Sequence, residues 1–181
     1  MMGADDEVIA RTIKRFEPFT KDGYPTLPEC WADVTMFNGD ETKNHAWTGA
    51  PLSLLYMCNA GITPTSPSFR TVQIKPQLGT LTGVSVTVER AGGKIVVDVE
   101  KTSNECTLNV ELSNGSFGGV VCVPRIDNAN TVIKLNGVII YENGSHVIKN
   151  MPSGVSYAQE DEDFIVFNVS AGEYTFVSQA N

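Results

Sequence analysis

The hydrophobic period of this sequence changes near Arg70, from about 3.6 residues to about 2. The change falls within the stretch 44–78, which begins with an apolar helical pattern at about 48–59 and is then interrupted by prolines from Pro64 to Pro76. Proline fixes φ and removes a backbone donor, so the second half of this stretch is predicted to be extended. Helices are therefore expected before it, and strands and turns after it.

Apolar and polar residues alternate through the second half of the chain, which predicts strands with one buried face. Val84, Val86 and Val88 alternate with polar neighbours. Similar strand patterns recur at 95–100, 107–112, 119–123, 132–135, 138–141, 164–169 and 174–177. Asn136-Gly137 and Ala171-Gly172 are predicted hairpin turns. These patterns indicate a mainly β fold, an antiparallel β-sandwich preceded by two helices.

The predicted helices are too few to bury their own apolar faces. The first is expected over 5–16, with an acidic N-terminus and with Pro18 ending it. The second is expected over 48–59. Each needs a further partner, which is either the β half of this chain or helices outside it. If the sandwich covers the second helix, Trp47 and Leu54 should lie buried at a helix–sheet junction; if helices are missing, the chain is a piece of a longer protein.

Composition excludes several classes of function. The net charge of −8 over 181 residues argues against nucleic-acid and anionic-membrane partners, which require clustered Lys and Arg. No apolar run approaches the ~20 residues of a membrane span, and the N-terminus lacks the features of a signal peptide. The four cysteines form no CxxC pair, which argues against a zinc site, and no phosphate-binding or dinucleotide-binding motif predicts a cofactor. The Asn-x-Ser triplets fix no compartment, so the localisation stays open.

The candidate site residues lie on the predicted loop 24–43 and just after it. Glu29 places a carboxylate near the indole of Trp31, and apolar neighbours can tune a carboxyl group for acid–base work. His45 stands just before the second helix, where it can reach a polar substrate. The simpler alternatives are a solvated loop glutamate, a local hydrogen bond from His45 at a helix start, and a tryptophan in the core.

The motifs around these residues resemble a known family. They are ECW at 29–31, NHAW at 44–47, and GITPTSPSFRTVQIKPQLGTL at 61–81; SAGEYTF at 170–176 agrees with them. Together they resemble the C-terminal part of the bacterial-type α-L-rhamnosidases, glycoside hydrolase family 78. In that family the end of an (α/α)6 barrel precedes a C-terminal β-sandwich. The resemblance implies that residues 1–61 are the last part of the barrel and residues 62–181 the sandwich. Ser68 departs from the family pattern, which has glycine there.

The resemblance also implies a role for each candidate residue. Glu29 matches the general base that activates water in an inverting hydrolysis. Trp31 matches the aromatic residue of the same loop, and His45 matches a histidine that contacts rhamnose. The family's general acid lies far upstream and has no counterpart in this sequence. The chain is therefore expected to be inactive alone and to depend on the remainder of the barrel.

Two alternative functions stay open at this stage. The first is a non-catalytic carbohydrate-binding or structural sandwich, which a row of exposed aromatic residues would favour. The aromatic residues considered for such a row are Tyr141, Tyr157 and Phe117, and their spacing predicts no row. The second is a related six-hairpin glycosidase that acts on another sugar.

Overall fold

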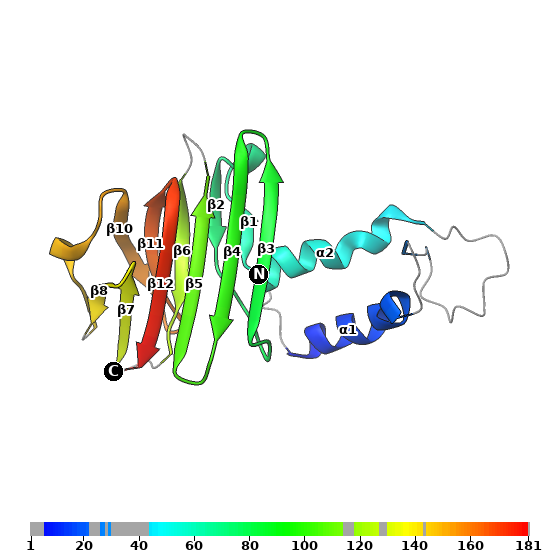
Figure 1. Cartoon of the computed structure of the whole chain (residues 1–181), viewed down its shortest axis with the longest axis horizontal. Helices are drawn as coiled ribbons and strands as arrows, with labels where there is room; N and C mark the ends of the chain where they lie inside the picture. The colour runs from blue at the N-terminus through cyan, green and yellow to red at the C-terminus, as the bar shows by residue number, and fades with distance from the viewer. Residues whose placement is uncertain are drawn as a thin grey trace.

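The computed structural model describes residues 6–21, 26–27, 29, 44–113, 118–126, 130–142 and 144–180. Two β-sheets make up most of this part of the chain, and helices precede them (Figure 1). The predicted mainly β sandwich is confirmed. Within the described residues, no helix has the length and apolarity that a membrane span requires.

The helical part consists of two segments. The first is α1 (Asp6–Lys21). The second is continuous, with a 3-10 turn (Ala46–Gly49), α2 (Ala50–Leu54) and a π-helical turn (Leu55–Asn59). Short 3-10 turns also occur at Pro67–Phe69 and Ile148–Asn150.

The strands form a five-stranded and a seven-stranded sheet. The five-stranded sheet has the order β1 (Ile62–Pro64), β2 (Thr71–Ile74), β6 (Gly118–Pro124), β11 (Phe164–Ser170) and β10 (Val155–Glu160). The seven-stranded sheet has the order β3 (Gly83–Arg90), β4 (Gly93–Lys101), β5 (Glu105–Leu112), β12 (Gly172–Ala180), β7 (Thr131–Leu135), β8 (Val138–Glu142) and β9 (Ser145–His146). All pairs are antiparallel except β2 with β6, because the excursion through β3, β4 and β5 returns the chain in the same direction.

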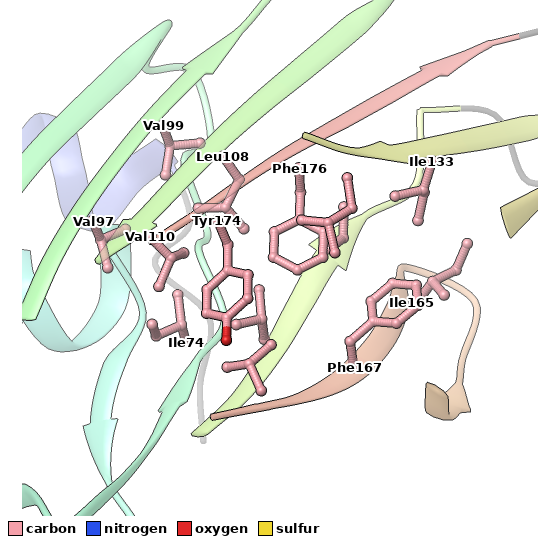
Figure 2. Packing of buried hydrophobic residues seen from close by; sticks show 14 of the residues in the cluster. Ile74, Val97, Val99, Leu108, Val110, Ile133, Ile165, Phe167, Tyr174 and Phe176 are labelled. Carbon is pink, nitrogen blue, oxygen red and sulfur yellow. The ribbon is translucent and has the colours of Figure 1, made fainter. Parts of the chain in front are cut away.

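The core lies between the inner faces of the two sheets (Figure 2). Alternate residues are buried in β2, β4, β5 and β12, as the period-2 pattern predicts. Phe167 of β11 stacks on Phe176 of β12 with ring centroids 5.6 Å apart. Tyr174 and Tyr157 extend this aromatic contact on either side. These aromatic contacts join the two sheets and stabilise their packing against each other.

The prediction of a hairpin at Ala171-Gly172 is wrong. β11 belongs to the five-stranded sheet and β12 to the seven-stranded sheet, so the chain crosses between sheets at this point. The Tyr174 hydroxyl donates a hydrogen bond to the Ser170 carbonyl oxygen at 3.0 Å, and a Cβ on Gly172 would lie 3.0 Å from that hydroxyl. Gly172 has φ +158, and the tyrosine bond holds the crossing in place. The hairpin predicted at Asn136-Gly137 is confirmed, with both residues at positive φ.

The prediction that Pro18 ends the first helix is wrong, because Pro18 lies inside α1, which continues to Lys21. Trp47 and Leu54 are 64% and 48% exposed, so the sandwich does not cover the second helical segment at these residues. Both helical segments project beyond the β3 edge of the sandwich (Figure 1).

The second helical segment is fixed to the sandwich at its C-terminal end. Gln77 donates its backbone N–H to the Asn59 carbonyl, and the Asn59 side-chain amide donates to the Gln77 carbonyl, each at 3.1 Å. The Lys75 N–H donates to the Gly61 carbonyl at 3.0 Å. Gly61 has φ +72, and a Cβ there would lie 2.1 Å from the Lys75 carbonyl, so only glycine fits this junction.

Candidate functional site

The candidate site forms where the segment carrying Glu29 meets the N-terminal end of the second helical segment. The His45 backbone N–H donates to the Leu27 carbonyl at 3.0 Å. The Trp47 indole N–H donates to the Glu29 carbonyl at 3.3 Å. Residues distant in sequence are thus held together by hydrogen bonds to the backbone.

These bonds bring together two of the three predicted site residues, Glu29 and His45. A carboxylate oxygen of Glu29 (Oε2) lies 3.6 Å from His45 Nδ1, and each side chain is 28% exposed. This separation exceeds a normal hydrogen bond, and it allows a charge interaction only with a protonated imidazole. For a pair that water reaches, such an interaction contributes at most ~1 kcal/mol to stability. The pair therefore contributes little to the stability of the fold, and both side chains are partly exposed, where a ligand can reach them.

The arrangement has defined chemical capabilities. An ionised carboxylate only accepts hydrogen bonds, so Glu29 can take a proton from a water molecule. The imidazole of His45 can donate a hydrogen bond to a hydroxyl group. His45 precedes the 3-10 turn in extended conformation, and its side chain does not cap that turn. His45 therefore does not act as a side-chain cap of this turn.

Trp31, the third predicted site residue, lies outside the described residues. A second tryptophan, Trp47, contacts both described site residues. The ring of Trp47 lies 4.0 Å from that of His45, centroid to centroid, with an interplanar angle of 36°. From the sequence, Trp47 was expected to be buried only if the sandwich covers the second helix. The available signal was its position two residues after His45 at the start of a helix, which brings the two rings to the same end of the helix.

An apolar surface adjoins the site. We call it the α2 surface; it consists of exposed large side chains of the second helical segment: Trp47 (64%), Leu52 (70%), Leu54 (48%) and Leu55 (39%). Exposed apolar side chains grouped on one element mark an interaction site more often than a free surface.

A second polar cluster lies within the sandwich. One carboxylate oxygen of Glu160 accepts a hydrogen bond from the Tyr141 hydroxyl at 2.5 Å and pairs with Arg125 at 2.9 Å. Burial, followed by the hydrogen bond to Glu160, raises the pKa of Tyr141. Among the described residues, no group of three or more His, Cys, Asp or Glu side chains is placed to hold a metal ion.

A family model matches the first part of the β half. Residues 61–137 match the family model of the bacterial alpha-L-rhamnosidase C-terminal domain. The predicted resemblance to the C-terminal part of these enzymes is confirmed.

Solved α-L-rhamnosidases share the fold. The enzyme from Dictyoglumus thermophilum superposes with a TM-score of 0.74 at 24% identity, over 91% of this chain and 17% of that one. The Streptomyces avermitilis enzyme complexed with L-rhamnose gives 0.67 at 19%, over 89% of this chain and 14% of that one. The Aspergillus terreus enzyme gives 0.55 at 15%, over 87% and 15%.

At these identities the likeness to solved structures establishes the fold alone. The chain spans 17% of the length of the D. thermophilum enzyme. No curated protein sequence matches it.

Proposed function

We propose that this chain is the C-terminal part of an inverting glycoside hydrolase of the α-L-rhamnosidase type, in which Glu29 is the general base. The observation that carries the proposal is the Glu29–His45 pair, 3.6 Å apart and open to solvent, just ahead of residues that match the rhamnosidase C-terminal domain. Trp31 and His45 are proposed to contact the sugar. The substrate class is a rhamnose-containing glycoside.

The proposed mechanism needs two carboxyl groups. In inverting enzymes these lie about 6.5–9.5 Å apart, which leaves room for a water molecule. Glu29 removes a proton from that water as its oxygen attacks the anomeric carbon. The bond to the leaving-group oxygen breaks, and a general acid on the opposite side protonates that oxygen. The acid belongs to the helical body of the enzyme and not to these 181 residues.

The proposed partner is this helical body, seated on the α2 surface. The sandwich begins at Ile62 and makes up about two thirds of the chain. The superposition on the D. thermophilum enzyme covers 91% of the chain, so it must include part of the helical segments as well. In addition, Trp47 and the exposed leucines of the α2 surface need a cover that the described part of the sandwich does not provide. Both observations support residues 1–61 as the end of a helical catalytic domain and residues 62–181 as the sandwich domain.

The test is hydrolysis of a nitrophenyl α-L-rhamnoside. The isolated 181-residue chain should show no turnover, because it lacks the general acid. In the full-length enzyme, Glu29→Ala should lower kcat by at least ~1000-fold while substrate binding persists, since both carboxyl groups are needed for inverting hydrolysis. Azide, which needs no base, should restore turnover to this variant by attacking the anomeric carbon itself. Glu100→Ala removes an exposed carboxylate of β4 and serves as the matched control. A Glu29→Ala enzyme with near-normal kcat would remove Glu29 from the mechanism.

The alternative of a non-catalytic carbohydrate-binding sandwich gains no support from its three candidate aromatic residues. Tyr141 is buried, Tyr157 stacks on His146 with centroids 4.3 Å apart, and Phe117 lies outside the described residues. Binding of a rhamnoside by the isolated chain, undiminished by Glu29→Ala and His45→Ala, would favour this alternative. Hydrolysis of another glycoside by the full-length enzyme, in preference to a rhamnoside, would instead place the chain in a related glycosidase.

A further inference from the structure

We propose that Trp47 is a positioning residue that holds Glu29 and His45 in their relative geometry. This inference rests on the proposed function. Trp47 contacts both residues at once: its indole N–H donates to the Glu29 carbonyl at 3.3 Å, and its ring lies 4.0 Å from the His45 ring. One side chain therefore links the proposed base to the proposed sugar-binding imidazole.

The carbonyl contact matters because of where Glu29 lies. Glu29 lies in a bend rather than in a helix or strand, so a bond to its own backbone helps to set where its side chain starts. The bond from His45 to the Leu27 carbonyl acts near Glu29, whereas the bond from Trp47 acts on Glu29 itself. Trp47 in turn lies in a 3-10 turn that continues into α2, and the far end of this helical segment is bonded to the sandwich. Trp47 thus connects the proposed base to the helical segment, and the helical segment connects it to the sandwich.

The ring contact acts on the other member of the pair. The imidazole of His45 makes no capping hydrogen bond, and the Trp47 ring limits how it can rotate. The two contacts use different parts of the indole, so substitutions can separate them. Trp47→Phe keeps an aromatic ring beside His45 and removes the N–H donor. Trp47→Ala removes both contacts.

The kinetic consequence should appear in kcat rather than in KM. A displaced base is poorly placed to deprotonate water, and misplacement by about 1 Å can cost ~100-fold in rate. In the full-length enzyme, Trp47→Ala should therefore lower kcat by ~100-fold. Trp47→Phe should lower it by up to ~10-fold, the equivalent of one neutral hydrogen bond, with KM within about twofold of the wild type.

The kinetic experiment compares these variants with Leu52→Ala and Glu29→Ala. Leu52 shares the α2 surface and is as exposed as Trp47, so Leu52→Ala reports the cost of weakening the cover over the helix. Loss of kcat in Trp47→Phe that exceeds the loss in Leu52→Ala supports positioning. Wild-type kcat in Trp47→Phe, or an equal loss in Leu52→Ala and Trp47→Ala, overturns it. Near-normal kcat in Glu29→Ala would contradict the proposed function itself. If Glu29→Ala is inactive and Trp47→Phe has wild-type kcat, only the positioning role is contradicted.

A second measurement needs no catalysis. Hydrogen exchange of the His45 amide, which is bonded to the Leu27 carbonyl, can be followed by NMR in the 181-residue chain. Trp47→Phe should accelerate this exchange by up to ~10-fold, because the Glu29 segment loses one of its attachments. The amide of Leu108 in the core of β5 is the internal control and should not change. Unchanged exchange at His45 would mean that the indole N–H does not hold the segment.

Discussion

Two buried thiols should make this protein lose stability in mild alkali. Cys106 on β5 and Cys122 on β6 are 1% and 3% exposed and form no disulfide. Burial raises the pKa of each thiol from 9.0 to about 11, because the thiolate is poorly solvated inside the protein. Nearby charges have smaller effects: Lys101 lowers the pKa of Cys106 and Lys75 lowers that of Cys122, while acidic neighbours oppose them.

The sign and the size of the effect follow from these pKa values. A thiol whose pKa is raised in the folded state favours folding fully below pH ~9, and this contribution is lost as the pH rises toward ~11. A shift from 9.0 to about 11 corresponds to about 2.7 kcal/mol per thiol at high pH. Between pH 8 and pH 10 each thiol should remove about 1.3 kcal/mol, or about 2.6 kcal/mol together. That is a large share of the ~5–15 kcal/mol by which domains are usually stable.

The assay is urea unfolding at pH 8 and pH 10 under reducing conditions. The wild type is compared with the double variant Cys106→Ala/Cys122→Ala, which keeps Cys30 and Cys58. The double variant should be less stable at both pH values because of the cavities, but its loss between them should be smaller by about 2.6 kcal/mol. The raised pKa values of Tyr141, Tyr157 and Tyr174 act equally in both proteins. Equal losses in the two proteins would refute the assignment to these thiols.

Two further predictions concern turns. Ser68 has φ 58°, a left-handed conformation that costs a non-glycine residue about 1–2 kcal/mol. Glycine avoids this cost but gives the unfolded chain more conformational entropy, so Ser68→Gly should raise the free energy of unfolding by about 0.5–1 kcal/mol. In the same urea titration, Ser66→Gly should lower the stability, since Ser66 is extended and its hydroxyl accepts the Thr71 N–H at 2.8 Å; a stabilising Ser66→Gly or a destabilising Ser68→Gly would contradict the argument. Tyr174→Phe removes the bond to the Ser170 carbonyl and should lower Tm by about 2–4 °C, or about 1 kcal/mol, in a calorimetric scan. An unchanged Tm would mean that the crossing between sheets does not need this bond.

The strands could be predicted where the buried face is continuous. Val97, Val99, Leu108 and Val110 alternate with polar residues, and that pattern alone assigns β4 and β5 to a half-buried sheet. The strand β10 was missed because its burial is confined largely to Val155, with the rest of the strand at an exposed edge. The edge strand β3 was nevertheless predicted, because Val84, Val86 and Val88 keep the alternation that β10 lacks.

The partner of a strand was harder to predict than the strand itself. Ala171-Gly172 has the sequence of a tight turn, but a turn between two strands of one sheet and a crossing between two sheets begin alike. The choice is made by Tyr174, whose hydroxyl bonds to Ser170, and by packing of Phe176 against Phe167 from the opposite sheet. These contacts depend on the assembled core, which a local pattern does not contain.

The candidate site was likewise predicted only in part from the sequence. The sequence motifs predicted Glu29 and His45, and the structure brings these two together. The contacts of Trp47 with Glu29 and His45 were not predicted, because tryptophans were expected to lie more often in a core. That expectation requires a cover within the chain, and both helical segments project beyond the sandwich instead.

The position of the site follows from where the second helical segment is anchored. Its C-terminal end is bonded to the sandwich through Asn59 and Gln77, and the Gly61 junction admits no larger residue. Its N-terminal end carries His45 and Trp47, and Trp47 holds the Glu29 carbonyl. A helix fixed at one end keeps a nearly constant direction, because its backbone bonds resist bending. On the proposed function, the sandwich thus contributes no group to the reaction but sets the direction of the helix from which the base is positioned.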